Sequence, residues 1–414
     1  MAGVERSGAL IRDAEAVVVG AGALGASIAF HLAKAGSRRI ALIDKHDLAS
    51  QTSPRAAGLT AQVRKTDLMT RLAMMAVRKI ERFEAETDEP LVYHQSGSMK
   101  IARTPEHHEQ LKREVARGQR LGLGIDLVSP AEARRLMPFL DPVGAQGITY
   151  TPSDLYLEPV QIPLGYARAA ARLGATVTPN TAVTGIVTKN GGVTGVITDQ
   201  GEIQTPVVVD AAGAWTRLVA QMANGRIPVV PTRHQLLITE PIDGVSTAQP
   251  IVRVIDSNVY VRPEKGGLML GGYEPDPIQY DTAALPAGFQ IKDLVLDIGV
   301  LRRLAGTVVA QFPILREFKV REHRGGLPTM TADGRHIVGP VPGIRGFFVA
   351  SGCCVGGLSI SPAVGEVLAE WILTGKPPMD LTFLAPERFG VEYHLEEKLQ
   401  AQCRWQYAHQ YSAP

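Results

Sequence analysis

The first clear pattern in the chain is a short apolar run over residues 16–20 that ends in glycine. Small and apolar residues at helical spacing follow over residues 23–35, and a second apolar run covers residues 40–43 and ends at Asp44. The order of strand, glycine turn, helix and strand predicts the first βαβ unit of a parallel sheet.

The middle of the chain mixes helical and strand patterns. We expect helices over residues 111–121, 129–138 and 160–173, and strands over residues 175–177, 183–187, 193–198 and 207–210. From residue 228 to residue 324 the pattern becomes mainly β. Strands are expected at residues 236–239, 251–255, 259–262 and 268–272, with one helical stretch at residues 291–304. This pattern predicts a second domain.

The last third of the chain begins with an apolar strand over residues 347–350 and a glycine-rich turn. A helix is expected over residues 362–373, with Ser361 as its N-cap and Pro362 in its first turn. The turn before it would then lie at the positive end of a helix, where backbone N–H groups stabilise negative charge.

Charge and composition exclude several classes of protein. The chain has 43 Lys plus Arg against 41 Asp plus Glu, and no long basic stretch, so nucleic acid is not an expected partner. No apolar run approaches the roughly 20 residues of a membrane span, and residues 1–13 lack the apolar core of a secretory signal, so we expect a cytoplasmic protein. The 3 cysteines and the absence of a Cys/His cluster predict neither a metal site nor a disulfide framework.

The glycine turn after the first strand carries the sequence GxGxxG, with Gly20, Gly22 and Gly25 in the three glycine positions. The first glycine permits the tight turn, the second lets the backbone approach a pyrophosphate, and the third packs helix on strand. Asp44 follows at the distance expected of an acid that binds an adenosine ribose. The motif predicts a dinucleotide, but its spacing alone does not separate FAD from NAD.

Further segments carry a resemblance to a known family. They are residues 20–25 (GAGALG), 53–59 (SPRAAGL), 97–102 (GSMKIA), 208–216 (VVDAAGAWT), 260–264 (YVRPE), 325–334 (GGLPTMTADG) and 351–365 (SGCCVGGLSISPAVG). In this order they resemble the FAD-dependent D-amino-acid oxidase superfamily, and within it the sarcosine and dimethylglycine oxidoreductase branch. The resemblance runs from residue 16 to about residue 376.

The resemblance implies an α/β fold with a Rossmann-type FAD-binding domain and a second, mainly antiparallel β domain for the substrate. We expect the FAD domain to be discontinuous, over residues 14–90, 145–226 and 325–376, and the substrate domain to cover residues 91–144 and 227–324. Residues 377–414 form a tail. Trp405, Tyr407 and Tyr411 in that tail suit a strap over the core or a docking segment for a partner, and we favour the strap.

The family's FAD contacts can be carried over residue by residue. The expected set is Gly20, Gly22, Ala23, Leu24, Gly25, Asp44, Lys45, Thr52, Ser53, Arg55, Ala57, Gly58, Leu59, Val183, Gly213, Trp215, Gly326, Gly352, Gly356, Gly357, Leu358 and Ser359. Relatives that attach FAD covalently use a histidine in a WHAAGL segment, where this chain has Pro54 and Arg55, or a cysteine ahead of a TxD element, where residues 324–330 contain none. The FAD is therefore expected to be noncovalent.

The substrate side departs from the family's pattern. Related enzymes often place a carboxylate-binding arginine just before the TxD element, but this chain has Pro328, so Arg262 or Arg324 is the expected substitute. Tyr260 aligns with an active-site tyrosine of sarcosine oxidases, and it shares a strand face with Arg262. Ser359 stands where oxidases carry a lysine that promotes reaction with oxygen, which favours a dehydrogenase.

The expected reaction is oxidation of a small secondary or tertiary amine by hydride transfer to flavin N5, followed by hydrolysis of the imine. The electron acceptor, oxygen or a redox carrier, stays open. One alternative is a flavin-dependent 2-hydroxy acid dehydrogenase, which needs a histidine base. The candidates for that base are His94, His234, His323 and His336. Another alternative is a flavoprotein subunit of a larger amine or opine dehydrogenase complex.

Overall fold

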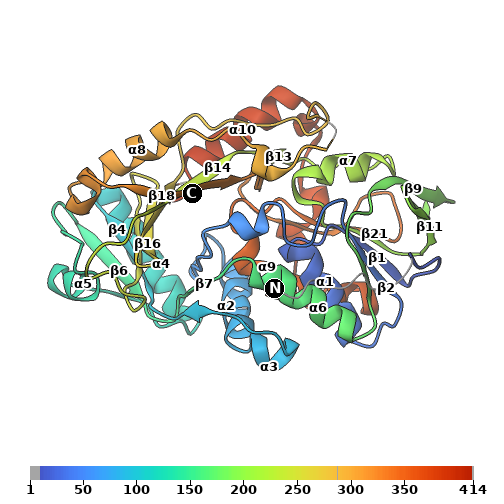
Figure 1. Cartoon of the computed structure of the whole chain (residues 1–414), viewed down its shortest axis with the longest axis horizontal. Coiled ribbons are helices and arrows are strands. Elements are labelled where there is room, and N and C mark those ends of the chain that lie inside the picture. Colours follow the sequence, from blue (N-terminus) through green and yellow to red (C-terminus); the bar gives the residue numbers. More distant parts are fainter. Residues whose placement is uncertain (1–9, 287, 413–414) are drawn as a thin grey trace.

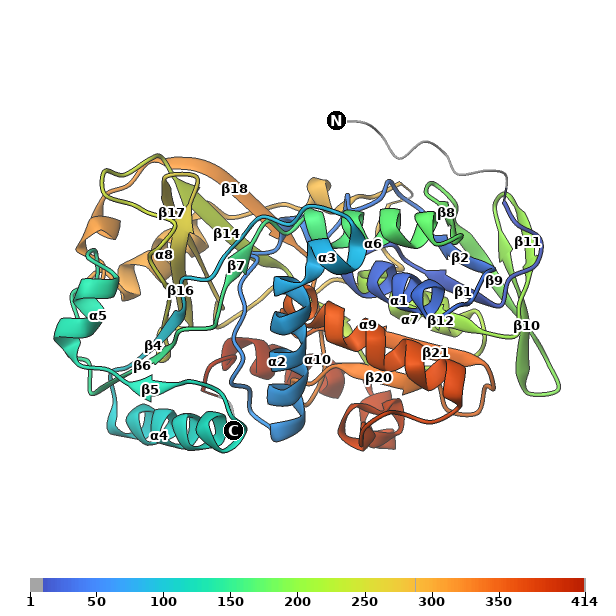
Figure 2. The same cartoon turned by 90° about the horizontal axis from the view of Figure 1, so that it is seen from below.

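Figure 1 shows the computed structural model of the chain, which describes residues 10–286 and 288–412. The expected absence of a secretory signal over residues 1–13 falls mostly outside these residues. Two sheets organise the molecule, one at each end of its long axis (Figures 1 and 2). Helix α10 (Glu396–Ala408) lies along the side of the molecule on which β14 and β13 connect the two ends (Figure 1).

The first sheet is the predicted nucleotide type. Its order is β20-β21-β12-β1-β2-β8, and every pair is parallel except β20 with β21. Its strands are β1 (Ala16–Val19), β2 (Ile40–Ile43), β8 (Thr176–Thr178), β12 (Val208–Asp210), β20 (Ile337–Pro340) and β21 (Phe347–Ser351). The central strands are valine- and isoleucine-rich and buried on both faces, as parallel strands covered by other layers require.

Helices cover one face of this sheet, and a small sheet lies near its other face. Helix α1 (Ala23–Lys34) packs between α6 (Gln161–Arg172) and α9 (Gly357–Thr374), and α2 (Asp67–Glu81) packs on α9 (Figure 2). The small sheet contains β9 (Val183–Lys189), β10 (Gly192–Thr198) and β11 (Gly201–Gln204), all antiparallel. Helices α3 (Phe83–Thr87) and α7 (Thr216–Gln221) complete this end of the molecule.

The second sheet has eight strands in the order β18-β14-β17-β16-β15-β4-β6-β5. They are β4 (Ser98–Ala102), β5 (Asp126–Leu127), β6 (Gly147–Thr151), β14 (His234–Thr239), β15 (Ile251–Val254), β16 (Val259–Glu264), β17 (Gly267–Gly272) and β18 (Val320–Gly326). All pairs are antiparallel except β15 with β4. Segments far apart in sequence thus form one sheet. It includes β6, although residues 145–226 are expected in the FAD domain.

Short strand pairs and helices connect and flank the two sheets. The pairs are β3 (Tyr93–His94) with β7 (Tyr156–Leu157), and β13 (Val230–Pro231) with β19 (Thr329–Met330). The flanking helices are α4 (Pro105–Arg120), α5 (Pro130–Leu136) and α8 (Ile298–Thr307). Helix α4 begins earlier than expected because Thr104 caps it and Pro105 occupies its first turn. The stretch expected at residues 291–304 divides into a 3₁₀ turn and α8, which begins only after Asp297 caps it.

The helix expected to begin at Pro362 begins at Gly357 instead, so Ser361 is not its N-cap. Pro362 lies inside α9, where it lacks the N–H that would bond to the carbonyl of Leu358. The Ser361 hydroxyl donates to that carbonyl at 2.9 Å and so replaces the missing bond. A Ser–Pro pair is typical of a helix start. Here it lies within the helix, where the Ser361 hydroxyl compensates for the N–H that Pro362 lacks.

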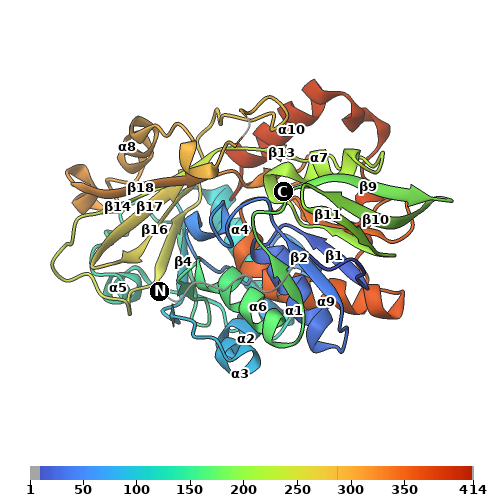
Figure 3. The ribbon, with the colours of Figure 1, turned by 45° about the vertical axis from the view of Figure 1, so that its right-hand side comes forward.

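The tail is a strap over the core, as the sequence favoured. Leu399, Cys403 and Tyr407 of α10 are buried, in one apolar cluster with Tyr260 and Tyr273 of the eight-stranded sheet. Trp405 faces outward and is 40% exposed. The view in Figure 3 shows α10 beside β13, between the two ends of the molecule. In the described part of the chain, no helix has the length and apolarity that crossing a bilayer requires.

Candidate active site

The glycine turn has the geometry that its motif predicts. Gly20 has a φ of 101°, which favours glycine, and a Cβ on Gly25 would lie 1.8 Å from the Gly20 carbonyl oxygen. Gly25 therefore lets α1 pack against the turn, and it does not itself line a cavity. A Cβ on Gly22 would meet only the Ser53 hydroxyl, at 3.3 Å, so the backbone there faces open space. The turn leaves room for a pyrophosphate at the N-terminus of α1.

Asp44 lies directly after β2 and lines the same cavity as Gly20 and Gly22. Its two carboxylate oxygens accept hydrogen bonds from the backbone N–H groups of Ala21 (2.7 Å) and His46 (2.8 Å). Burial raises the pKa of Asp44 to about 6, although both of these bonds favour the carboxylate. The acid is thus fixed beside the turn, with its remaining lone pairs free to accept from a ribose hydroxyl.

The far end of this cavity is lined by Lys45, Trp215 and Val183, all expected at the cofactor site. The Lys45 ammonium lies 3.7 Å from the centre of the Trp215 ring, a cation–π contact. Burial lowers the pKa of Lys45 to about 8. Trp215 also lies 5.7 Å from the His46 ring, so a flat aromatic and apolar wall closes this end.

A second cavity joins the first at Gly22, Thr52, Ser53 and Gly213, which line both. The connecting segment is fixed from two sides. The Ser53 hydroxyl accepts from Ala23 N–H at 3.0 Å, and the Thr52 hydroxyl accepts from Leu327 N–H at 3.2 Å. The other predicted cofactor residues that line this second cavity are Ala23, Leu24, Arg55, Ala57, Gly58, Leu59, Gly326, Gly356, Gly357, Leu358 and Ser359.

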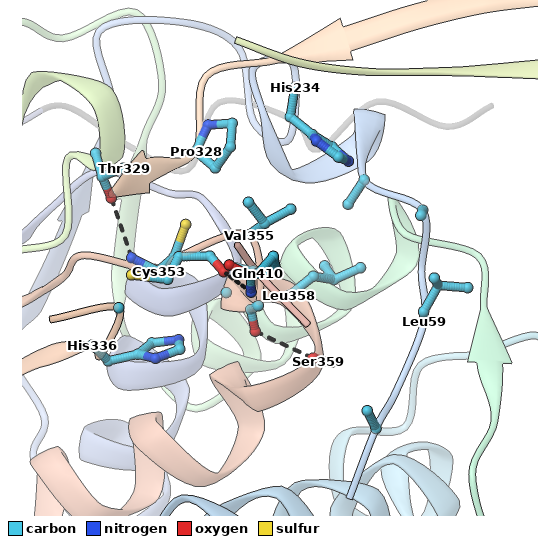
Figure 4. A pocket seen from close by; sticks show the side chains of 18 of the residues that line it. Leu59, His234, Pro328, Thr329, His336, Cys353, Val355, Leu358, Ser359 and Gln410 are labelled. Carbon is cyan, nitrogen blue, oxygen red and sulfur yellow. Dashed lines mark hydrogen bonds between the residues drawn. The ribbon is translucent and has the colours of Figure 1, made fainter. Parts of the chain in front are cut away.

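The loop before α9 holds unusual backbone conformations (Figure 4). Cys354 and Val355 have φ values of 43° and 65°, in the left-handed region that a β-branched residue such as valine rarely enters. Cys354 N–H bonds to Thr329 O at 2.9 Å, and the Cys354 carbonyl accepts from the Gln410 side chain at 3.2 Å. Such strain is retained where the surroundings fix it, and here it places the first N–H groups of α9 against the cavity.

Several predicted site residues do not line either cavity. Gly352 has a φ of 60°, and a Cβ there would lie 2.6 Å from the Thr331 side chain, so its role is in the turn. Arg262 is buried and donates to Ala57 O (2.9 Å), to Pro263 O (2.6 Å) and to Glu264 (2.5 Å). The expectation that Arg262 lines the pocket with Tyr260 is not met, because these partners hold its guanidinium on the segment behind the cavity.

Arg324 is held away from the pocket in a similar way. Its guanidinium donates to Glu322 at 3.1 Å and to Ala56 O at 3.4 Å. Neither arginine proposed from the sequence as a carboxylate ligand therefore faces the cavity in this geometry, whereas Tyr260 does. The two arginines tether residues 56 and 57, next to the cofactor segment, to the eight-stranded sheet.

Three other arginines, which sequence reasoning missed, line the cavity instead: Arg64, Arg253 and Arg335, the last 4.0 Å from the Asp333 carboxylate. Arg64 follows the cofactor segment, and Arg253 lies on β15. Arg64 donates to the Ser359 hydroxyl at 3.4 Å, and Arg253 donates to Thr60 O at 2.6 Å. Arg64 Nε and Arg253 Nη1 are buried without a partner among the described residues. Burial, and then the nearby charge of Arg253, lower the pKa of Arg64. A half-buried cation at Arg64 and a buried cation at Arg253, each with a free donor, suit an anion.

Aromatic side chains and one histidine also line this cavity: Tyr260, Tyr273, Tyr411 and His234. His234 Nε2 lies 3.0 Å from the Tyr260 hydroxyl oxygen, and Nδ1 lies 2.8 Å from that of Tyr407 on α10. Burial lowers the pKa of His234 to about 4, so the ring is neutral at pH 7. Tyr411 comes from the tail, and no motif in the sequence connects it to this site.

Of the four histidines considered as bases, the structure brings two to the cavity. His234 and His336 line it, whereas His94 lies in the short strand β3 and His323 bonds to Gln235 at 3.2 Å. Both ring nitrogens of His336 are buried without a partner among the described residues (Figure 4). Burial lowers the pKa of His336 to about 3.

The joined cavities fit FAD. Backbone N–H groups at the start of α1 suit the pyrophosphate, Asp44 suits the ribose, and the first turn of α9 suits the electron-rich edge of a flavin. The family model that matches residues 15–371 is described as FAD dependent oxidoreductase. The chain belongs to this family of FAD-dependent oxidoreductases, and its α/β fold with parallel and antiparallel sheets confirms the class predicted from the sequence.

Three relatives illustrate the range of the family. The chain is 33% identical to mitochondrial sarcosine dehydrogenase from Homo sapiens, over 89% of this chain and 40% of that protein. It is 30% identical to 4-methylaminobutanoate oxidase (formaldehyde-forming) from Paenarthrobacter nicotinovorans, over 94% of this chain and 47% of that protein. The crystal structure of L-proline dehydrogenase from P. horikoshii superposes with a TM-score of 0.82 at 27% identity and covers 92% of this chain and 98% of that one. The chain thus spans less than half the length of these two curated relatives.

Proposed function

We propose that this chain is a FAD-dependent dehydrogenase of small N-methylated amines that carry a carboxylate. The guanidiniums of Arg64 and Arg253, each with a buried and unpartnered nitrogen on the cavity, carry this proposal. The arginine expected before the TxD element is replaced by Pro328, and these two residues take over its task from another side of the cavity. The names of sarcosine dehydrogenase and 4-methylaminobutanoate oxidase support a substrate of this class.

The charges around the cavity also suit the chemistry. An aliphatic amine has a pKa of about 10.4 in water, and only its neutral form readily gives up a hydride. Arg64 and Arg253 disfavour a further positive charge on the substrate amine, and the buried tyrosines exclude water. Glu114 also lines this cavity, but its carboxylate is paired with the Lys100 ammonium at 2.6 Å. The pocket therefore holds the carboxylate of the substrate and favours its neutral amine.

The flavin, when bound, supplies the acceptor for a hydride from the carbon next to the nitrogen. The imine product then hydrolyses in water to an amine and an aldehyde. We propose that the FAD is noncovalent, because Pro54 and Arg55 stand where relatives carry the attachment histidine. Acid precipitation should leave the yellow colour in the supernatant, and flavin in the pellet would contradict this part of the proposal.

We further propose that a redox carrier, and not oxygen, is the physiological electron acceptor, because Ser359 occupies the position of the oxidases' lysine. The Ser359 hydroxyl donates to Gly356 O at 3.2 Å and accepts from Arg64. Reoxidation of the reduced protein by air should be slow in stopped-flow measurements, and an artificial electron acceptor should accelerate it. Reoxidation by air as fast as turnover would identify an oxidase.

The decisive experiment is anaerobic mixing of the flavin-loaded protein with matched substrates. Sarcosine, N,N-dimethylglycine and N-methyl-4-aminobutanoate should bleach the flavin band, whereas dimethylamine, which lacks the carboxylate, should do so at least about tenfold less efficiently. Bleaching by dimethylamine as efficiently as by sarcosine would contradict the proposal that Arg64 and Arg253 bind the substrate carboxylate.

A 2-hydroxy acid dehydrogenase remains the second candidate function, because His234 and His336 bring neutral imidazoles to the cavity. A hydroxyl group needs such a base, whereas a neutral amine does not. Lactate and 2-hydroxyglutarate in the same anaerobic assay test this reading. Bleaching by hydroxy acids alone would replace the amine proposal with this one.

A further inference from the structure

The tail contributes to the cavity through a line of three side chains. Tyr407 lies on α10, beyond the residues that match the family model, and its hydroxyl oxygen lies 2.8 Å from His234 Nδ1. His234 Nε2 lies 3.0 Å from the hydroxyl oxygen of Tyr260, which lines the cavity. Figure 4 shows His234 above the loop that holds Val355, while Gln410 of the tail lies at that loop.

The end of α10 is fixed at several points, so this contact is well defined. Asn258 donates to Ala408 O at 2.8 Å, Gln406 donates to Ala332 O at 3.3 Å, and Gln110 donates to Tyr411 O at 2.7 Å. The Tyr407 ring also packs edge-on against Tyr273, with ring centres 5.2 Å apart. These contacts tie the tail to the residue before β16, to α4 and to the turn at residues 331–334, and so hold Tyr407 against His234.

The direction of the hydrogen bonds follows from counting protons. His234 is neutral, so one ring nitrogen donates and the other accepts. The Tyr407 side chain is fully buried, and His234 is the only hydrogen-bond partner of its hydroxyl in the described part of the chain. If His234 donated to Tyr407, the tyrosine's own proton would be buried without an acceptor, which is costly. Tyr260 is equally buried, but it lines the cavity, where a bound substrate can accept its proton. Tyr407 therefore donates to Nδ1, and Nε2 carries the proton and donates to Tyr260.

This arrangement determines what Tyr260 presents to the cavity. Because Tyr260 accepts from His234, its own proton is free to point elsewhere. The side of the ring toward β17 is closed, since a Cβ on Gly271 would lie 2.1 Å from the Tyr260 hydroxyl oxygen. The free proton is thus directed to the open side of the cavity, where Arg64 and Arg253 also present their donors.

We infer that Tyr407 is a positioning residue: by donating to His234 it makes Tyr260 a hydrogen-bond donor to the carboxylate of the bound substrate. This inference rests on the proposed function, to which it adds a third ligand for the carboxylate and a role for the tail. Without Tyr407, no donor holds Nδ1 as an acceptor, so the preference for the proton on Nε2 is weakened. Tyr260 can then compete by donating to Nε2, and in that arrangement its proton is lost to the substrate.

The test measures carboxylate binding directly on the FAD-loaded protein. Acetate is titrated while the shift of the flavin absorbance is followed, so that no turnover is needed. Tyr407→Phe and Tyr260→Phe should each weaken acetate binding about tenfold, the value of one hydrogen bond to a charged group. Tyr393→Phe is the matched control, because Tyr393 is on the same tail but outside the cavity, and it should bind acetate normally.

The double variant separates positioning from a general structural effect. If Tyr407 acts through Tyr260, the Tyr407→Phe/Tyr260→Phe protein should bind acetate no more weakly than Tyr260→Phe alone. Additive losses, or unchanged binding in Tyr407→Phe, would overturn the inference. Such results would leave the amine proposal intact if sarcosine still bleached the flavin. Conversely, a non-additive cycle would stand even if no amine were oxidised.

A second measurement covers the case in which Tyr407→Phe does not retain FAD. Nitrogen NMR of the unmodified protein, prepared with nitrogen-15-labelled histidine, detects the tautomer of His234 directly, and the signal is assigned by its loss in His234→Gln. The proton should lie on Nε2. A proton on Nδ1 would show that Tyr407 does not donate to His234, and would overturn the inference.

Discussion

The two ends of the molecule build their parts of the site in different ways. At the nucleotide end, backbone atoms define the cavity: the turn at Gly20, the start of α1 and the start of α9 present N–H groups, and Asp44 is one of the few side chains required. At the substrate end, side chains define the cavity. Arg253 and Tyr260 come from the neighbouring strands β15 and β16, Tyr273 directly follows β17, and Tyr411 comes from the tail.

The difference decides what each end tolerates. A backbone site depends on a local conformation and on close packing, so a single added Cβ can abolish it. A side-chain site depends on charge and hydrogen bonding between residues that are distant in sequence, so substitutions there should alter affinity without loss of the fold. The predictions below test this contrast, from the largest expected effect to the smallest.

Gly25→Ala should have the largest effect, because its Cβ would lie 1.8 Å from the Gly20 carbonyl oxygen, a backbone atom that cannot move without opening the turn. We expect a loss of about 3 kcal/mol or more in unfolding free energy, with loss of FAD. Thermal melts with excess FAD provide the measurement. The control is Gly306→Ala at the other end, in α8, where no atom lies within 4 Å and stability should rise by about 0.5 to 1 kcal/mol.

Gly22→Val should separate cofactor binding from folding. A Cβ at Gly22 meets only the movable Ser53 hydroxyl, so the chain should fold, but the side chain would fill the space meant for a pyrophosphate. The protein should purify colourless, and its melting temperature should no longer respond to added FAD. At a concentration of one hundred times Kd, the missing stabilisation corresponds to about 2.7 kcal/mol. Full FAD content in this variant would contradict the cofactor site.

The same contrast explains how much of the structure the sequence predicts. The βαβ unit at residues 16–43 was predicted almost to the residue, because glycine spacing and a buried strand leave few alternatives. Helix α9 was placed five residues late, since Ser361 and Pro362 resemble a helix start. The sequence predicts Arg262 or Arg324 as the carboxylate ligand, and neither lines the cavity. For Arg262, strand alternation gives the face of a residue, but not which partners will hold its side chain.

Arg64 and Arg253 were missed because nothing in the sequence near them forms a motif, and only the eight-stranded sheet brings them together. The one usable signal was the absence of a clamp at Pro328, which required a substitute cation somewhere on the cavity. Tyr411 and Tyr407 were even less accessible, since a tail of mixed composition does not indicate which of its aromatic residues turn inward.

Exchange of arginine for methionine should distinguish the binding cation from the structural one. Arg64→Met should weaken acetate and sarcosine binding about ten- to a hundredfold, while stability stays nearly constant, because the change also removes a buried charge beside Arg253. Arg262→Met should instead lower the melting temperature, since Glu264 and two carbonyls lose their partner. Titrations and melts of both variants provide the measurement, and weak carboxylate binding in Arg262→Met alone would reverse the assignment.

The smallest effect should be one of pH, at a histidine of the nucleotide end that lies outside both cavities. His31 on α1 is buried, and its Nδ1 lies 2.7 Å from Ser27 O, so the neutral ring donates there. Burial, and then the charge of Lys79, lower the pKa of His31 to about 3. Lys34 adds to this shift, and Glu86 opposes it.

The sign follows from linkage. In the unfolded chain His31 has a pKa of about 6.5, so between pH 6.5 and about 3 the unfolded state binds the extra proton and the folded state does not. Stability is therefore lost as the pH falls through this window, by up to about 1.4 kcal/mol per pH unit, or about 2 kcal/mol at pH 5. His31→Asn offers a donor to Ser27 O that does not titrate, so its unfolding free energy should fall less steeply from pH 6.5 to pH 5. The same replacement at exposed His394 is the control, and parallel pH profiles for His31→Asn and the unmodified protein would show that His31 does not contribute to acid sensitivity.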